Sequence, residues 1–155
     1  MMVYIFATCL YFKGHYNFDM EVPGRVPGLK WATILVATYA VIWVALEGDL
    51  GRVTLLGCAV ALLLVGSVLQ RWVAGRRLST RLWLSLCAAL GTLAGFSSAI
   101  LTLIFMAVKT GLHAHGPEFD PGQINWVVGQ VPWWTSAGLL AGLGLGLIFV
   151  VVQQR

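Results

Sequence analysis

A run of 27 residues between Arg81 and Lys109 contains no charged side chain and is mostly apolar. A transmembrane helix needs only about 20 such residues to cross a hydrocarbon core of about 30 Å. A helix that is apolar on every side has to be buried in a large core or placed in a membrane. The run therefore predicts a transmembrane helix that tilts or protrudes from the bilayer.

The composition of the chain supports the same class of protein. Of the 155 residues, 59% are hydrophobic and 10% are charged, whereas soluble domains are about half apolar and about a quarter charged. The net charge of +4 does not indicate nucleic-acid binding, because the basic residues stand between apolar runs and form no extended basic face. We interpret them as topology determinants and contacts to anionic lipid headgroups.

Four apolar stretches predict four transmembrane helices, over residues 29–46, 53–69, 81–108 and 133–152. The six-residue link EGDLGR between the first two is short enough to form an antiparallel hairpin. The predicted fold is an all-α integral membrane protein with four transmembrane helices in two antiparallel hairpins. Residues 29–152 form this transmembrane domain, and 153–155 form a short cytoplasmic tail.

Residues 1–28 are expected to be a cytoplasmic or interfacial N-terminal segment. The apolar stretch 1–12 is too short to span a bilayer, and two Pro-Gly turns in 22–29 exclude helix interior there. Two interpretations stay open: residues 1–12 form an interfacial or re-entrant helix, or the natural chain starts at Met20.

The link between the third and fourth apolar stretches carries a helix-start signal. Asp120 is a good N-cap acceptor, Pro121 fits the first helical position, and Gln123 stands where a capping-box partner belongs. Pro132 is expected to end this segment. The pattern predicts a short interfacial helix over 121–130.

Four residues flanking these stretches are expected to be interfacial anchors. Trp126, Trp133 and Trp134 are predicted at headgroup level, where an indole ring is buried and its N–H stays hydrated. Lys109 is expected to extend its ammonium group to the headgroups.

Charge asymmetry predicts the orientation. With the loop carrying Arg71, Arg76, Arg77 and Arg81 in the cytoplasm, eight basic residues lie inside and two outside. The inner set is Lys13, Arg25, Lys30, Arg71, Arg76, Arg77, Arg81 and Arg155, and the outer set is Arg52 and Lys109. This positive-inside pattern predicts a multi-pass plasma-membrane protein with both termini cytoplasmic.

One loop groups side chains of the metal-ligand type, namely His113, His115, Glu118 and Asp120. We favour a solvated polar loop whose carboxylates lie near a helix N-terminus. A divalent metal site, or pigment or haem ligation by a histidine, stays an alternative. No cofactor is required by the sequence, and the three cysteines form neither a zinc nor a redox motif.

Glycines spaced four apart indicate close helix packing. They are Gly91, Gly95, Gly138, Gly142 and Gly146. Small residues at this spacing let another backbone approach closely. The partner is either a helix of the same chain or another membrane subunit, including a second copy.

The predicted function is that of an accessory or assembly subunit of a larger membrane complex. The predicted spans lack central ionisable residues, which transporters usually need, and the chain has no catalytic motif. A homo-oligomeric channel or transporter lined by Thr92, Ser97, Ser98 and Thr102 is the first alternative. A lipid-acting enzyme of the outer leaflet, using His113, His115 and Asp120, is the second.

Overall fold

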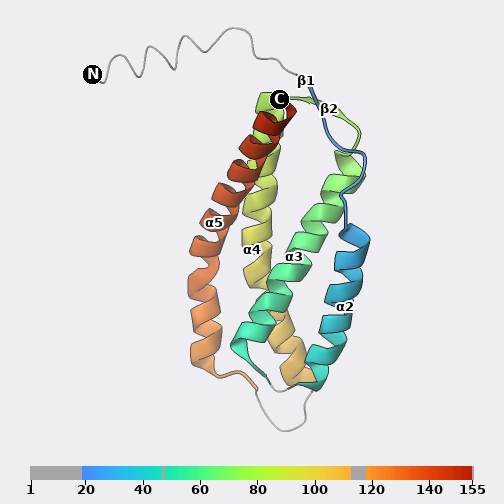
Figure 1. Cartoon of the computed structure of the whole chain (residues 1–155). Helices are drawn as coiled ribbons and strands as arrows, with labels where there is room; N and C mark the ends of the chain where they lie inside the picture. The colour runs from blue at the N-terminus through green and yellow to red at the C-terminus, as the bar shows by residue number, and fades with distance from the viewer. Residues whose placement is uncertain (1–18, 47, 113–117, 155) are drawn as a thin grey trace, which may run out of the picture.

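The structure, a computed structural model, describes residues 19–46, 48–112 and 118–154. Four helices make up most of this part of the chain: α2 (Leu29–Ala45), α3 (Leu50–Trp72), α4 (Thr80–Leu112) and α5 (Pro121–Gln153) (Figure 1). The prediction of an all-helical membrane-type protein is confirmed, because α3, α4 and α5 are long and apolar enough to cross a bilayer. Helix α2 is equally apolar but has only 17 residues. The expectations for residues 1–12 lie outside the described residues.

Local sequence signals set the first two helix starts. Helix α2 follows Gly28, whose φ of 76° is accessible to glycine at little cost. Helix α3 follows Asp49, whose carboxylate accepts a hydrogen bond of 2.9 Å from the Arg52 backbone N–H. This bond satisfies one of the free N–H groups of the first turn.

Helix α5 is one continuous helix of 33 residues, and this corrects two predictions. The short helix over 121–130 and the helix over 133–152 are parts of the same element, and Pro132 lies inside it. The Thr135 and Ser136 hydroxyls donate to the Val131 and Pro132 carbonyls at 2.7 and 2.8 Å. Proline is tolerated inside transmembrane helices that have packed neighbours, although Pro132 leaves the Val128 carbonyl without its backbone donor.

Two short strands, β1 (Asp19–Glu21) and β2 (Arg77–Ser79), form an antiparallel pair that the sequence did not predict. Glu21 is opposite Arg77, and Val22 exchanges backbone hydrogen bonds of 3.0 Å with Arg76 and Gly75. Strands of three residues are too short to show a period of two, so a tertiary pairing determines them.

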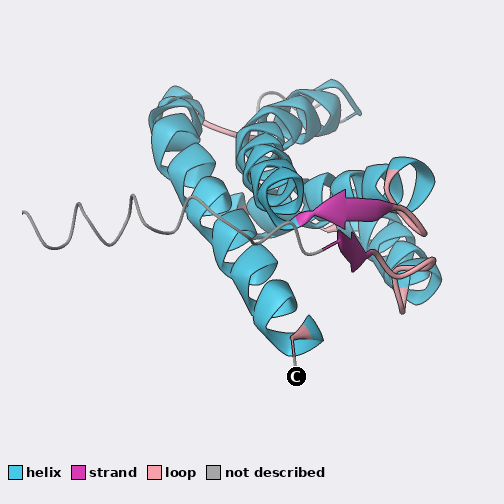
Figure 2. Ribbon diagram, turned by 90° about the horizontal axis from the view of Figure 1, so that it is seen from above, coloured by secondary structure: helices cyan, strands magenta, loops and turns pink. Residues whose placement is uncertain are grey.

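The helices pack mainly on their neighbours in the chain, and the α4–α5 interface is the most extensive (Figures 1 and 2). Two buried clusters lie toward opposite ends of the molecule. The first contains Trp43, Val53, Leu56, Met106, Phe119 and Val127. The second contains Val22, Val73, Trp83 and Val150, so it ties the segment after β1 to the helix ends.

Candidate functional site

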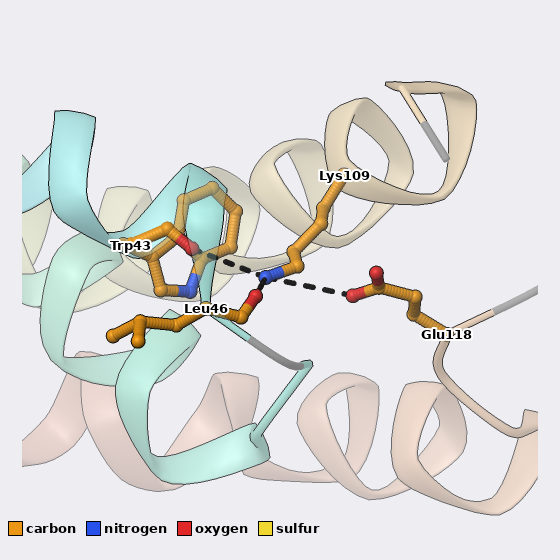
Figure 3. Close-up of polar contacts among 4 residues, drawn as sticks. All are labelled: Trp43, Leu46, Lys109 and Glu118. Carbon is orange, nitrogen blue, oxygen red and sulfur yellow. Dashed lines mark hydrogen bonds and ion pairs between the residues drawn. The ribbon is translucent and has the colours of Figure 1, made fainter.

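The side chain of Lys109 is completely buried in the described structure, three residues before the end of α4. It points between the end of α2 and the segment that precedes α5 (Figure 3). A buried lysine has to be paired or hydrogen-bonded, because an isolated buried charge is very costly. The surroundings of its ammonium group therefore define the site.

The Lys109 ammonium group donates to two backbone carbonyls at the end of α2. The Trp43 carbonyl oxygen accepts at 3.1 Å, and the Leu46 carbonyl oxygen is the second acceptor. The last carbonyls of a helix have no partner within the helix and carry the negative end of its dipole. Lys109 thus satisfies both the hydrogen-bonding and the charge requirement of the α2 C-terminus.

Glu118 and the Trp43 ring complete the site. The Glu118 carboxylate lies 3.5 Å from the Lys109 nitrogen, and the nitrogen is 4.8 Å from the centroid of the Trp43 ring. Gly48 lies directly beside this ion pair, where an added Cβ would be 3.1 Å from the Glu118 Cβ. A side chain at Gly48 would displace the Glu118 carboxylate from this position.

This arrangement is suited to holding helix ends together and not to covalent chemistry. An ammonium group has three donors and no acceptor, and here they face two carbonyls and a carboxylate. The site joins α2, α4 and the start of α5 through one residue. It also corrects the expectation for Lys109, whose ammonium group turns inward because helix-end carbonyls and a carboxylate are within its reach.

The sequence did not identify the backbone acceptors of this site. Trp43 and Leu46 contribute carbonyl groups, which every residue carries, so residue type gives no signal. The available indication was general: a lysine at the end of one apolar helix can pair with the free carbonyls at the end of another. Which helix end Lys109 reaches depends on the packing of α2 beside α4, and that packing is a tertiary property.

The predicted metal-ligand residues are only partly described. His113 and His115 lie outside the described residues. Glu118 pairs with Lys109, and Asp120 accepts from the Gln123 N–H at 2.9 Å in a capping box. The predicted capping box is confirmed, and within the described residues no three metal-type side chains come together.

The five glycines singled out by their spacing lie along the contact between α4 and α5. An added Cβ at Gly91 would overlap the Gly138 carbonyl and lie 3.0 Å from the Gly142 nitrogen. An added Cβ at Gly95 would lie 2.7 Å from the Trp134 carbonyl carbon. The Gly146 carbonyl accepts a hydrogen bond of 3.3 Å from the Trp83 indole. Backbone therefore packs directly on backbone here.

The hydroxyl groups of α4 bond to their own helix. Thr92, Ser98 and Thr102 each donate to the carbonyl four residues earlier, at 2.7–2.8 Å. Ser98 and Thr102 are buried, and both pack against Gly57 of α3. These three hydroxyl groups thus form hydrogen bonds within their own helix.

The tryptophans of α5 lie at different positions along the axis of the helix bundle. Trp134 is opposite Gly95, which is 14 residues from both Arg81 and Lys109. Trp133 and Trp134 are therefore level with the middle of α4, about 21 Å from either charged residue along the helix axis. Their expected headgroup position depended on a helix break at Pro132 that does not occur. Trp126 lies about 12 Å closer to the Lys109 end.

Comparisons with protein-family models, with curated proteins and with solved structures found no match to this chain. Function has to be inferred from the arrangement of the described residues alone. The two features that bear on it are the buried Lys109 site and the exposed surface of α5.

Proposed function

We propose that this chain is a four-span plasma-membrane protein with both termini in the cytoplasm, and that it serves as a small subunit of a larger membrane complex. The described part is made of long apolar helices. Its polar groups hold these helices together, as the Lys109 site does. A subunit whose role is to bind other membrane helices needs apolar helices and polar groups that hold them together.

The extent of α2 along the axis of the helix bundle supports a fourth transmembrane span. Helix α3 has charged residues at Arg52 and Arg71, which are about 28 Å apart at 1.5 Å per residue. Tyr39 of α2 donates to the Arg52 carbonyl at 3.3 Å, and Val26, just before α2, donates to the Gln70 side chain at 3.4 Å. Helix α2 and the turn before it thus cover the same height as α3, and 17 residues are at the lower limit for a span.

The orientation is supported by charge at the two ends. The end with β1 and β2 carries six described cationic residues: Arg25, Lys30, Arg71, Arg76, Arg77 and Arg81. The opposite end carries Arg52 and Lys109, and Lys109 is already paired. Positive charge favours the cytoplasmic side, so the strand-bearing end is proposed to face the cytoplasm.

Helix α5 exposes a continuous face opposite its contact with α4. This outer face of α5 is defined by Gly129, Pro132, Trp133, Ser136 and Leu140, which are all exposed. Their spacing of three and four residues puts them on one side of the helix. Trp133 is 71% exposed and Leu140 is 69% exposed, so the face has a large aromatic group beside small residues.

The observation that carries the proposal is the position of Trp133 on this face. It lies level with the middle of α4, far from the headgroup level that tryptophan prefers in membrane proteins. Its indole N–H makes no hydrogen bond to a described residue, and lipid chains offer no acceptor. A protein partner in the bilayer would supply one. The Val128 carbonyl is a second polar group on α5 without its helical donor, because Pro132 has no backbone N–H.

The test is purification of the tagged chain from its native membrane in mild detergent, with quantitative mass spectrometry of the bound proteins. Wild type is expected to retain other membrane subunits in a fixed ratio. Trp133→Leu should lower their recovery about thirtyfold, the loss typical of a buried aromatic at an interface. Trp31→Leu is the matched control, since Trp31 is 72% exposed at the start of α2.

Two results would contradict the subunit proposal. The chain would purify alone, or Trp133→Leu would retain the same proteins as wild type. A homodimer that is lost in Trp133→Leu would instead support the homo-oligomeric channel or transporter, and flux assays in liposomes would follow.

A further inference from the structure

The strand-bearing end of the molecule presents exposed positive charge that the described structure leaves unneutralised. We call it the basic end and define it by Arg25, Lys30, Arg71, Arg76, Arg77 and Arg81, all of which are exposed. None of the six forms an ion pair with a described residue. The same region of the sequence contributes only two acidic residues, Asp19 and Glu21. Six cations against two anions create a local field that attracts anionic partners.

The backbone that carries Arg76 and Arg77 is held in place. Arg76 accepts a hydrogen bond of 3.0 Å from Val22, and Arg77 pairs with Glu21 in the strand register. Val22 is buried against Val73, Trp83 and Val150 at the helix ends. In addition, the Gln153 side chain of α5 donates to the Glu21 carbonyl at 2.8 Å. Arg77 on β2 and Arg76 directly before it are thus carried on backbone that is hydrogen-bonded over the helix ends.

Two exposed tryptophans place this charge at the depth of lipid headgroups. Trp72 is 67% exposed and directly follows Arg71, and Trp31 is 72% exposed and directly follows Lys30. The apolar stretch of α3 ends at Arg71, about 28 Å from Arg52 along the helix axis. A bilayer core of about 30 Å would therefore have its polar surface at Arg71, where tryptophan is favoured.

We propose that the basic end binds the phosphate groups of anionic phospholipids in the inner leaflet. Arginine predominates over lysine there, five to one, and its planar guanidinium group can hold phosphate oxygens in pairs. The anionic inner leaflet attracts basic residues next to transmembrane helices. The binding itself requires only that the helices lie in a bilayer, and its assignment to the inner leaflet rests on the orientation proposed above. Both are independent of the proposed protein partner of α5.

The experiment uses the full chain reconstituted in vesicles with equal parts of phosphatidylcholine and phosphatidylglycerol, followed by native mass spectrometry of the retained lipids. Wild type is expected to retain phosphatidylglycerol in excess over phosphatidylcholine. Arg76→Gln should reduce this excess about fivefold, and the Arg76→Gln, Arg77→Gln double variant about thirtyfold. Arg52→Gln removes the same charge from the opposite end of α3 and should leave the excess unchanged.

A salt series on the wild-type protein gives a second readout that needs no variant. The excess should fall as salt rises, because salt screens exposed charges. Soluble glycerol phosphate should not displace the lipid, because only a lipid is held at the membrane surface beside Trp31 and Trp72. The proposal is overturned if Arg52→Gln causes the same loss, if the double variant keeps the excess, or if glycerol phosphate competes as well as the lipid does.

Discussion

At the residue scale, Lys109 joins three segments through a single ammonium group. It connects the last carbonyls of α2, its own helix α4 and Glu118 just before α5. A buried charge of this kind is tolerated because two carbonyl oxygens, a carboxylate and the face of an indole ring surround the ammonium group. Removing the lysine would leave Glu118 and two helix-end carbonyls without their shared partner.

We therefore predict that Lys109→Met lowers the free energy of unfolding by about 3–5 kcal/mol, the cost of breaking a buried pair on one side. The measurement is thermal or denaturant unfolding of the full chain in one detergent. Lys30→Met is the matched control, because Lys30 is exposed at the start of α2, and its effect should be within about 0.5 kcal/mol. If Lys109→Met is as stable as this control, the ammonium group does not hold the helix ends together.

A double variant isolates the ion pair from the other contacts. Glu118→Gln should itself be destabilising, and Lys109→Met combined with Glu118→Gln should cost less than the sum of the two single changes. Additive effects would show that the 3.5 Å contact between these side chains contributes little energy.

At the element scale, the α4–α5 interface has direct contacts between backbone atoms at its glycines. An added Cβ at Gly142 would lie 3.0 Å from the Gly91 Cα and overlap the Cys87 carbonyl. Two residues further along the same helix, a Cβ at Gly144 would meet no atom within 4 Å. Both positions are glycines of α5 at nearly the same depth in the helix bundle, so they form a matched pair.

We predict opposite signs for alanine at these two positions. Gly142→Ala should destabilise the protein by about 1–3 kcal/mol, because α4 and α5 have to separate. Gly144→Ala should be neutral or stabilise the helix by up to about 1 kcal/mol, because alanine has less backbone entropy to lose. Unfolding in detergent and crosslinking between α4 and α5 would measure both. Equal effects at the two positions would be inconsistent with the close approach at Gly142.

The elements also show where sequence reasoning succeeded. Uninterrupted apolar stretches predicted the all-helical membrane class, and the Asp120 cap predicted where α5 begins, because both signals are local. Pro132 was expected to end a helix, as it usually does in soluble proteins, whereas α5 continues through it. The β1–β2 pair and the inward turn of Lys109 were not predictable, since each depends on a partner distant in sequence.

At the scale of the whole molecule, charge is unequally divided between the two ends. Changing Arg76, Arg77 and Arg81 together to glutamate would lower the number of basic residues at the inner end from eight to five, against two at the outer end, and so weaken the bias that orients the helices. We predict that a reporter fused to the C-terminus of this variant no longer reads as fully cytoplasmic. Arg52→Glu strengthens the original bias and should leave the reporter cytoplasmic. A cytoplasmic reporter in the triple variant would count against the proposed orientation.

The position of α2 has a consequence for biosynthesis. It leaves the ribosome before the other three described helices, yet its contact with α3 is less extensive than the later interfaces. Its carbonyls at Trp43 and Leu46 receive the ammonium donor of Lys109 only after that residue, more than 60 positions later, has been synthesised. The first of these helices to be inserted is therefore fully secured only after α4 has been synthesised.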